Sequence, residues 1–439
     1  MISKENYIDA IAIIFTYILA VIFLLHPMLS TPLLPGIDGP YYAVQVRWLV
    51  ERGELKYADP PLAFLLLTAF YLVLGDLFLA VKLGSVLLTS LAVLPIYLLV
   101  KRLTSSRIAG IAAGLAFAIN PFTLKLYSDF IKNSIGLLWL NLFLLFEIRY
   151  MQDSSRKNLV GLIVALVLTA LTHILDYGVA LFYAISLFSL SIPFTRDIKK
   201  ALPGAAIAFL SFAGLVAAPW VVGGDVRKGF AFITQLAESD LEPVVMQQHW
   251  FILALALSVA LFAKSYFSRD NSEMAMLCIA SGILAILVNL PILPRNWLFR
   301  FRLMTNIPLA YAVGMALTSK KEGENLVAAI LILALLLVIS LPATGVVRPS
   351  IPPPAYQELK DAIAKCEATV GKARIPDVRL RYWAETISDN VEGASRGNTL
   401  GNSCLIFLKT RKPIHIPPGQ KIYEGAYILA LRPKKPGRP

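Results

Sequence analysis

Long runs of apolar residues recur through the first 345 residues, and no other feature constrains the fold so strongly. A run of about 18 or more apolar residues can cross the hydrocarbon core of a bilayer as a helix. The composition agrees, because 57% of the residues are hydrophobic and only 16% are charged, whereas a typical soluble domain has about 25% charged residues. The sequence therefore predicts an all-α, polytopic membrane protein.

We expect about eleven membrane-spanning helices. The first run resembles a signal peptide, but no small-residue cleavage site follows it and further runs come after it, so we interpret it as a helix. The expected spans are residues 8–26, 77–100, 107–120, 133–150, 158–172, 178–194, 201–219, 249–263, 273–292, 303–318 and 326–342.

The basic residues predict the orientation. Short cytoplasmic loops retain Lys and Arg, and five alternate loops each hold at least two of them, beginning at Lys101, Arg149, Arg196, Lys264 and Thr318. With these loops inside, the long polar connector 27–76 and the other chemically interesting loops lie on the extracytoplasmic side. The same rule accounts for the net charge of +13, so we expect membrane lipids and no nucleic acid as partners.

The composition changes after the last expected span. Residues 1–345 form the expected transmembrane domain, and residues 346–439 form a small, soluble, basic α+β domain, placed outside by the odd number of spans. We expect a helix at 355–370 and short strands at 378–383, 404–408 and 427–431. Cys366 and Cys404 could pair if this domain is extracytoplasmic, or stay free.

The connector 27–76 contains two acidic turns around a short helix. Asp38 precedes Gly-Pro and the helix that begins near Tyr41. Asp is favoured as a helix cap, and the local sequence favours this role. The alternative is a catalytic base or metal ligand at the membrane surface. The second turn contains Pro60 and Pro61, which we expect, with Tyr41, to position the connector.

Asp129 and Lys132 lie in the next expected outer loop. Their spacing suits a surface ion pair between residues i and i+3 on a helix. They also lie where the chain re-enters lipid, and an acidic residue there is costly without a role. The two interpretations are equally well supported by the sequence.

His173 and Asp176 lie between the fifth and sixth expected spans. At a spacing of three they can share a helix face, orient one another or bind a metal ion. No HExxH or CxxC spacing supports the metal site, so a His–Asp hydrogen bond is the favoured interpretation.

Three arginines, Arg295, Arg300 and Arg302, alternate with aromatic residues before the tenth span. Guanidinium groups bind phosphate well, and we favour a bound lipid phosphate over arginines that reach out to lipid headgroups. A further outer loop, 223–249, contains Glu238, Asp240 and Glu242 and is expected to be a solvated loop rather than a substrate flap.

Residues 8–150 resemble the GT-C superfamily of polytopic glycosyltransferases, which includes protein O-mannosyltransferases, aminoarabinose transferases and the catalytic subunit of oligosaccharyltransferase. The resemblance rests on Asp38 in DGPYY after the first span, on the Pro-Pro-Leu turn after Asp59, and on Asp129 at the second acidic motif. Lys82 stands where relatives often have Arg. Neither outer loop has a DxD, there is no WWDYG, and His173 and Asp176 match no standard position of the family.

The resemblance implies transfer of a sugar from a polyprenyl-phosphate-linked donor to a protein, lipid or glycan acceptor at the extracytoplasmic face of the cell membrane. Asp38 would be the general base, and Asp129 would assist through a divalent cation (Mg²⁺ or Mn²⁺) or by hydrogen bonding. The expected donor-binding residues are Lys82, Lys132, Arg295, Arg300 and Arg302, with His173 and Asp176 as accessory or metal-binding residues.

Two other classes of protein stay open. A transporter or flippase of a lipid-linked precursor would place ionisable residues and broken helices near the middle of the membrane, whereas the charges here gather at one face. A noncatalytic membrane assembly protein would leave the outer loops without a role.

Overall fold

The computed structural model describes residues 4–195, 197–222, 248–291, 295–318, 322–393, 403–409 and 418–433. The chain divides into two compact units, each assembled from three segments. The helical unit comprises residues 1–28, 57–66 and 83–347, and the sheet unit comprises residues 29–56, 67–82 and 348–439. The sequence-based division at residue 346 stays a prediction.

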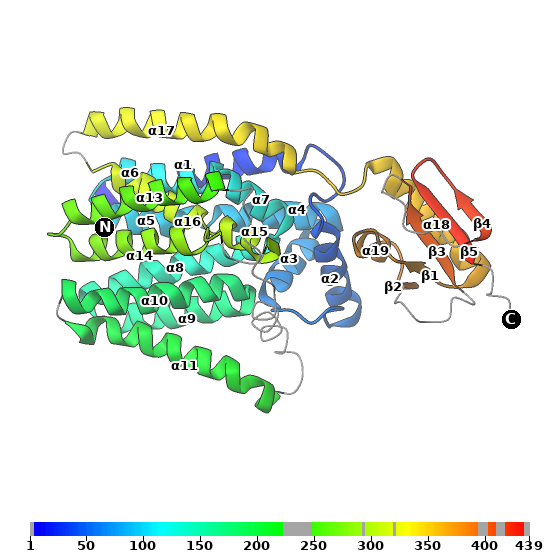
Figure 1. Cartoon of the computed structure of the whole chain (residues 1–439), viewed down its shortest axis with the longest axis horizontal. Coiled ribbons are helices and arrows are strands. Elements are labelled where there is room, and N and C mark those ends of the chain that lie inside the picture. The colour runs from blue at the N-terminus through cyan, green and yellow to red at the C-terminus, as the bar shows by residue number, and fades with distance from the viewer. Residues whose placement is uncertain are drawn as a thin grey trace. The chain divides into compact units, whose positions relative to one another are not determined.

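The helical unit is a bundle of long helices whose axes run side by side (Figure 1). Two helices, α3 (Leu62–Leu74) and α4 (Leu77–Ser90), are shared between the units. The other helices of the bundle are α1 (Lys4–Met28), α5 (Val93–Thr104), α6 (Arg107–Ile119), α7 (Pro121–Asp129), α8 (Ile131–Asp153), α9 (Arg156–Thr172), α10 (Ile174–Phe194), α11 (Ile198–Val222), α13 (Gln248–Phe267), α14 (Ser272–Leu287), α15 (Arg295–Leu303), α16 (Asn306–Ala316) and α17 (Glu322–Ala343), followed by the 3-10 turn Thr344–Val346.

Each expected span overlaps a helix, and the span at 77–100 overlaps both α4 and α5. By length and composition, six of the described helices can cross a membrane, or seven if α6 and α7, which meet at an angle of 53°, are one broken span. Others are shorter, such as α14 with 16 residues and α16 with 11. The mainly helical, multi-pass architecture is confirmed, and the count of eleven spans stays a prediction.

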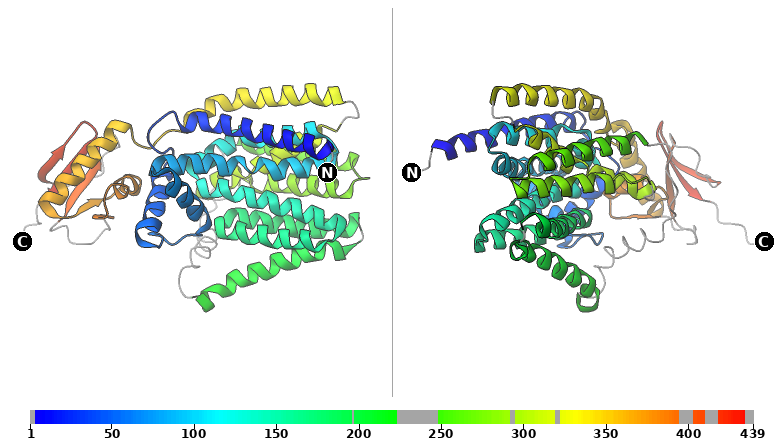
Figure 2. Two further views of the ribbon diagram at one scale, coloured as in Figure 1. Left: turned by 180° about the vertical axis from the view of Figure 1, so that it is seen from behind. Right: turned by 60° about the vertical axis from the view of Figure 1, so that its left-hand side comes forward.

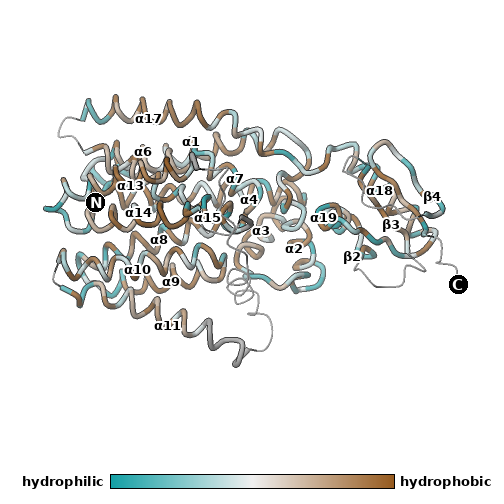
Figure 3. Tube along the Cα trace, viewed as in Figure 1, coloured by the Kyte–Doolittle hydropathy of each residue, from teal (hydrophilic) through white to brown (hydrophobic). Residues whose placement is uncertain are grey.

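Helix α17 shows why this bundle needs a lipid environment. It lies at the edge of the bundle in every view (Figures 1 and 2) and is strongly apolar (Figure 3). Only Asn325, Ala329 and Ser340 are buried along it, while Leu331 and Val338 are each 65% exposed. A helix that exposes such an apolar surface is stable in hydrocarbon rather than in water.

The bend between α6 and α7 is built by Asn120 and Pro121. The Asn120 amide donates to the carbonyl oxygens of Ala116 and Phe117, at 2.8 Å each, and closes α6. Its Oδ1 accepts from the backbone N–H of Thr123 at 3.0 Å and begins α7. Proline is favoured at the first position of a helix because it needs no N–H partner there. Helix α7 begins at this bend and ends at Asp129.

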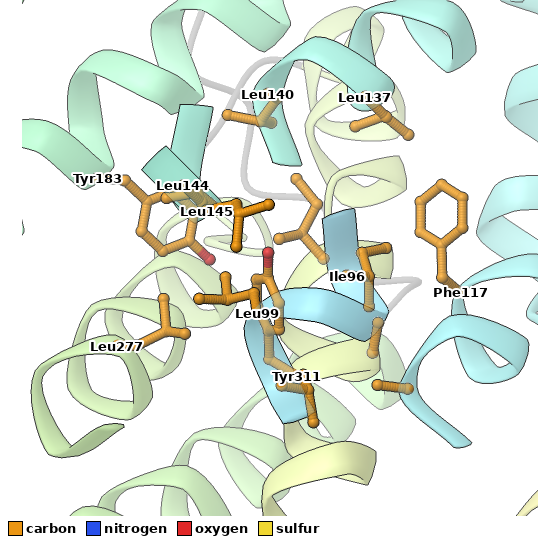
Figure 4. Packing of buried hydrophobic residues seen from close by; sticks show 14 of the residues in the cluster. Ile96, Leu99, Phe117, Leu137, Leu140, Leu144, Leu145, Tyr183, Leu277 and Tyr311 are labelled. Carbon is orange, nitrogen blue, oxygen red and sulfur yellow. The ribbon is translucent and has the colours of Figure 1, made fainter. Parts of the chain in front are cut away.

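The core of the bundle is made by large side chains from several helices (Figure 4). Leu99 of α5, Phe117 of α6, Leu277 of α14 and several leucines of α8 belong to one cluster of buried side chains. The buried Tyr311 hydroxyl donates to Asn141 Oδ1 at 2.7 Å, so this polar pair is satisfied within an apolar core.

The sheet unit combines the connector helix α2 (Gly39–Arg52) with a five-stranded sheet of order β2-β1-β3-β5-β4. Strand β1 is parallel to β2 and β3, and β5 is antiparallel to β3 and β4. The remaining elements are α18 (Pro353–Val370), β1 (Ala373–Ile375), α19 (Val378–Glu385), β2 (Val391–Gly393), β3 (Cys404–Leu408), β4 (Gly419–Glu424) and β5 (Ile428–Pro433).

The expected strand at 378–383 is wrong, because this segment is helix α19. Asp377 caps the helix by accepting from the backbone N–H of Arg379 at 2.9 Å. Leu380 and Trp383, three residues apart, are buried together, as the period of a helix requires. Alternation of Arg with apolar residues imitated a strand. The other two strands are confirmed as β3 and β5.

A disulfide joins Cys366 of α18 to Cys404 of β3. It ties the helix to the strand at the centre of the sheet. The pair that the sequence left open is therefore formed. Disulfides persist mainly in oxidising compartments.

Candidate active site

Asp38 occupies the N-cap position of α2, but its side chain makes no capping hydrogen bond. The residue lies in the helical region of backbone conformation, with φ −91° and ψ −6°, and Pro40 follows at the start of the helix. Capping normally requires an extended cap residue and a free N–H at N2 or N3. The half-buried carboxylate of Asp38 is therefore not used to begin α2, contrary to the local interpretation.

Tyr41 and Tyr382 are the aromatic neighbours of this acidic turn within the sheet unit. Their rings meet edge to face, with centroids 5.3 Å apart, and Gln45 Nε2 donates to the Tyr41 hydroxyl at 3.0 Å. Burial raises the pKa of Tyr382, and the charge of Asp38 adds to the effect while Arg381 opposes it. Tyr382 therefore lies near Asp38, and no local sequence pattern pointed to this contact.

Ion pairs hold α2 and its following loop against α19. Arg47 pairs with Asp389. Lys56 Nζ lies 3.3 Å from Glu385 Oε1, and Arg381 Nε lies 3.5 Å from the same oxygen. Glu385 is buried, so these contacts fix the orientation of the connector on the C-terminal residues.

Lys82, an expected donor-binding residue, lies in α4 within the sheet unit. Its ammonium group donates to the backbone carbonyl of Thr31, and the side chain is buried. The other described residues that we expected to bind the donor, Lys132, Arg300 and Arg302, belong to the helical unit.

Lys132 and Asp129, two of the site residues expected from the sequence, each form an ion pair within the helical unit. Lys132 Nζ donates to Asp59 Oδ1 at 2.5 Å, and Asp59 immediately precedes Pro60 and Pro61. Lys125 Nζ donates to Asp129 Oδ2 at 2.7 Å, one helical turn along α7. The turn at Pro60 and Pro61 therefore brings the carboxylate of Asp59 to Lys132. The two residues of this ion pair are 73 positions apart in the chain.

His173 and Asp176 lie together where α9 gives way to α10. Oδ2 of Asp176 is 3.3 Å from Nδ1 of His173, and Nδ2 of Asn133 on α8 is 2.8 Å from the same ring nitrogen. Burial lowers the pKa of His173 well below its usual range, and the positive charges of Lys132 and Arg300 lower it further. The imidazole is therefore neutral and lies close to two cations.

Helix α15 carries the arginines. The Arg300 guanidinium lies over the rings of Phe130 and Trp297, 5.4 Å from each centroid, and is exposed. Arg302 is buried. Arg295 begins the helix, but its side chain lies outside the described structure, as do residues 223–247 with Glu238, Asp240 and Glu242.

No cluster of three or more His, Cys, Asp or Glu side chains that could hold a metal ion occurs among the described residues. His173 and Asp176 have an amide and cations as neighbours rather than a third ligand. Within the described parts of each unit, the residues therefore do not fit an ion held by three protein ligands.

Residues 58–221 match the family model of dolichyl-phosphate-mannose-protein mannosyltransferases. This range includes the Asp59 turn, Lys132 and His173 and begins after Asp38. No curated protein matches the chain by sequence.

Among solved structures, ArnT from Cupriavidus metallidurans bound to undecaprenyl phosphate is 13% identical with a TM-score of 0.62, and the match covers 98% of both chains. The archaeal oligosaccharyltransferase AglB from Archaeoglobus fulgidus, in complex with an inhibitory peptide and a dolichol-phosphate, is 13% identical with a TM-score of 0.58. That match covers 87% of this chain and 64% of AglB, so the chain spans less than two thirds of that relative.

At this level of identity the structural likeness shows the fold alone. It extends over nearly the whole chain for ArnT, and the family model adds an independent match in sequence. The protein is a multi-pass membrane protein with the fold of the GT-C superfamily of glycosyltransferases.

Proposed function

We propose that the protein is a membrane glycosyltransferase that moves a sugar from a polyprenyl-phosphate-linked donor to an acceptor at the extracytoplasmic face of the cell membrane. The observation that carries the proposal is the group formed by Lys132, Arg300 and His173 at one end of the helical bundle. Cations at the end of apolar helices suit a phosphate attached to a lipid. The solved relatives with dolichol-phosphate and undecaprenyl phosphate support this choice of carrier.

The donor phosphate is the leaving group in this reaction. As the bond between the sugar carbon and the phosphate oxygen breaks, the phosphate gains negative charge. Lys132 and Arg300 stabilise that charge more strongly in the transition state than in the bound donor, which is what accelerates the reaction. Arg302 and Arg295 lie on the same helix as Arg300 and extend the proposed donor site. Lys82 remains a further proposed donor-binding residue.

The acceptor supplies a hydroxyl or amide group whose proton must leave as its bond to the sugar forms. Asp38 is the proposed base, because its half-buried carboxylate stands at the start of α2 near Tyr382. Asp129, held by Lys125, assists through hydrogen bonding. No step is assigned to a metal ion.

The disulfide between Cys366 and Cys404 supports the assignment to the extracytoplasmic side. Asp38 and the disulfide belong to the same compact unit. Disulfides persist mainly in oxidising compartments, which supports the proposed extracytoplasmic position of Asp38.

Radiolabelled polyprenyl-phosphate sugars, mannose first, would be given to the purified protein in nanodiscs with protein, lipid and glycan acceptors from a membrane extract. We expect donor-dependent transfer that falls by about 10²-fold or more in Asp38→Asn, the usual contribution of a general base. Asp76→Asn is the matched control, because Asp76 caps α4 through the N–H of Leu79 at 2.8 Å. Full activity in Asp38→Asn would remove Asp38 from the mechanism.

Two additional measurements test whether the reaction needs a metal ion and whether the protein is a transporter. Transfer measured in EDTA and after addition of Mg²⁺ or Mn²⁺ separates a carboxylate that binds metal from one that takes a proton. Translocation of the lipid measured without acceptor tests the transporter class. Glu147, fully buried in α8, is the residue that such a transporter would use, so Glu147→Gln belongs in this arm. Translocation without transfer would replace the proposed function.

A further inference from the structure

Helix α8 carries a cation near each of its ends. Lys132 is the second residue of the helix, and Arg149 lies in its last two turns. Between them the helix rises by roughly 26 Å, at about 1.5 Å per residue, which is close to the hydrocarbon thickness of a bilayer, about 30 Å. Helix α8 is long and apolar enough to cross a membrane. The two cations therefore lie near opposite membrane surfaces, and the proposed transfer uses only the first.

The charge of Arg149 is poorly compensated. The side chain is half-buried, and its Nε is shielded from solvent without a hydrogen-bond partner among the described residues. The charges that act on it are those of Arg102, which repels it, and Asp153, which attracts it. A guanidinium group taken partly out of water without a paired anion is costly. An anion supplied from outside the chain would remove that cost.

A hydrogen bond holds Arg102 beside Arg149. Helix α5 packs against α8, and Nε of Arg102 donates to Oε1 of Gln152. Gln152 lies three residues after Arg149, so the two share a face of α8. This bond uses only Nε, and the N–H groups of the two terminal nitrogens of the exposed Arg102 remain for another acceptor. Two guanidinium groups held together repel one another, and an anion shared by both would turn that repulsion into attraction.

Asp153 does not supply this anion. Its Oδ1 accepts from the backbone N–H of Ser155 at 3.0 Å and from Nδ2 of Asn158 at 2.7 Å. The carboxylate is therefore engaged at the start of α9 and forms no ion pair with either arginine in the described structure. The first two residues of α9, Arg156 and Lys157, are exposed and add two cations to the same turn.

The neighbouring cations of α5 and α6 differ from this pair. Lys101 and Arg107 both form ion pairs with Asp9 of α1, so one acidic residue serves two basic ones there. Arg102 and Arg149 have no such carboxylate among the described residues. The uncompensated charge is therefore confined to the place where the last turns of α5 and α8 meet the start of α9.

Helix α9 carries an exposed apolar face that begins one turn after Arg156 and Lys157. Its exposed members recur at the spacing of one helix face and are 43–58% exposed: Val160, Val164, Val167 and Leu171. The opposite face, with Leu162 and Leu166, is buried, and the helix packs against α8. Cations followed by an apolar strip suit a phosphate that carries acyl chains, whereas a soluble phosphate needs no such strip.

We propose that Arg102 and Arg149 bind the phosphate of an anionic phospholipid in the leaflet opposite the proposed donor site, with its acyl chains along the exposed face of α9. The basic loops place this end on the cytoplasmic side in the orientation expected from the sequence, and anionic lipids of that leaflet attract such cations. Arg156 and Lys157 extend the positive surface around the headgroup. This site is separate from the proposed transfer and does not depend on it.

The test is native mass spectrometry of the purified protein in detergent, with phosphatidylglycerol or phosphatidylcholine added. We expect the wild type to retain phosphatidylglycerol in preference to phosphatidylcholine. Arg149→Gln and Arg102→Gln should each weaken the binding of phosphatidylglycerol by about tenfold or more, the effect of one hydrogen bond between charged groups. Arg102 is exposed, so its variant tests the charge without disturbing the packing of the bundle. Equal retention of the two lipids by the wild type would overturn the inference.

Arg269→Gln is the matched control, because it removes one exposed charge at the same end of the bundle. Arg269 lies over the ring of Tyr266, 4.4 Å from its centroid, and the nearby Asn271 donates to the carbonyl oxygen of Leu103 on α5 at 2.9 Å. Phosphatidylglycerol binding should be unchanged in this variant. A loss as large as that in Arg102→Gln would mean that general surface charge attracts the lipid, against the proposed site.

Inorganic phosphate distinguishes a lipid from a soluble ligand. We expect an equal concentration of inorganic phosphate to leave the bound phosphatidylglycerol in place, because it lacks acyl chains to pack on α9. Complete displacement would assign the two arginines to a soluble anion and overturn the choice of a lipid. Each of these results is independent of whether the protein transfers a sugar.

Discussion

The helical unit and the sheet unit treat charge in opposite ways. In the helical unit, Asp176 and Glu147 are completely buried without hydrogen-bond donors among the described residues. In the sheet unit, pairs such as Lys372 and Glu392 lie at the surface, with side chains 60% and 41% exposed. A charge inside the bundle is expensive and points to a role, whereas a surface pair costs and contributes little. Asp38 of the sheet unit is a candidate for a different reason: it stands at the N-cap position of α2, and its side chain makes no capping hydrogen bond there.

The largest expected effect is in the helical unit. Lys132→Met should reduce transfer by about 10²–10³-fold, the usual loss when one donor to a developing oxyanion is removed. Lys264→Met is the matched control, because Lys264 of the same unit donates to the Thr318 hydroxyl and has no role in the proposed reaction. Steady-state rates with saturating donor would check this. Equal losses in the two variants would mean that net charge, rather than Lys132 itself, supports the reaction.

The disulfide gives the next largest effect, and it should be confined to the sheet unit. The Cys366→Ser, Cys404→Ser double variant should lose roughly 2–4 kcal/mol of stability, because the bond restricts the unfolded chain. Pulse proteolysis of the purified protein, with cleavage mapped to residues 348–439, would measure the loss. The buried, free Cys278 of the helical unit provides the control Cys278→Ser. Cleavage that begins in α8 or α10 instead would show that the two units do not unfold separately.

Acid should weaken the sheet unit through Glu358. Its carboxylate accepts from the backbone N–H groups of Ala426, Tyr427 and Ile428 at 2.8–2.9 Å. Burial by itself raises the pKa of Glu358, but these hydrogen bonds outweigh it and lower the pKa below 4.5. The stabilisation is therefore complete above about pH 4.5 and is lost as the pH falls through the lower, folded pKa.

Unfolding of the sheet unit followed from pH 7 to pH 3 would test this, with Glu358→Gln expected to flatten the acid limb. Asp361→Asn, a change of an exposed acid on the same helix, should leave the limb unchanged. An unaltered limb in Glu358→Gln would assign the acid sensitivity to other groups.

The smallest expected effect concerns the ion pair between Arg47 and Asp389. Both side chains are partly exposed, at 15% and 34%, so a double-mutant cycle with Arg47→Met and Asp389→Asn should give a coupling of about 1 kcal/mol or less. A coupling of several kcal/mol would show that the surface pairs of the sheet unit are as costly to break as buried ones.

Hydropathy predicted the helical segments well because lipid selects long apolar runs, whatever their neighbours. It could not decide which helices cross the membrane, since α16 and α14 are short and depend on packing. The segment 378–383 was misread because Arg379 and Arg381 alternate with apolar residues while Leu380 and Trp383 share a helix face.

The candidate site was predictable only where its contacts are local. His173 is the N-cap residue of α10 and Asp176 is the third residue of that helix, so their contact follows from the local geometry of a helix start. The partner of Lys132 is 73 residues away, and Tyr382 approaches Tyr41 from the other end of the chain. No local pattern encodes such contacts.

The sheet unit is assembled from segments that lie far apart in the chain, and this has a consequence for how the protein is made. Arg47 and Asp389 are 342 positions apart, so α2 emerges from the ribosome long before α19, which completes its surroundings. At about 5–20 residues per second, the delay is roughly 15–70 s, while the intervening helices insert. Side chains of α2 such as Tyr41 and Arg47 are therefore without their partners Tyr382 and Asp389 during that interval. The sheet unit can therefore be completed only after the last helix of the bundle has been synthesised.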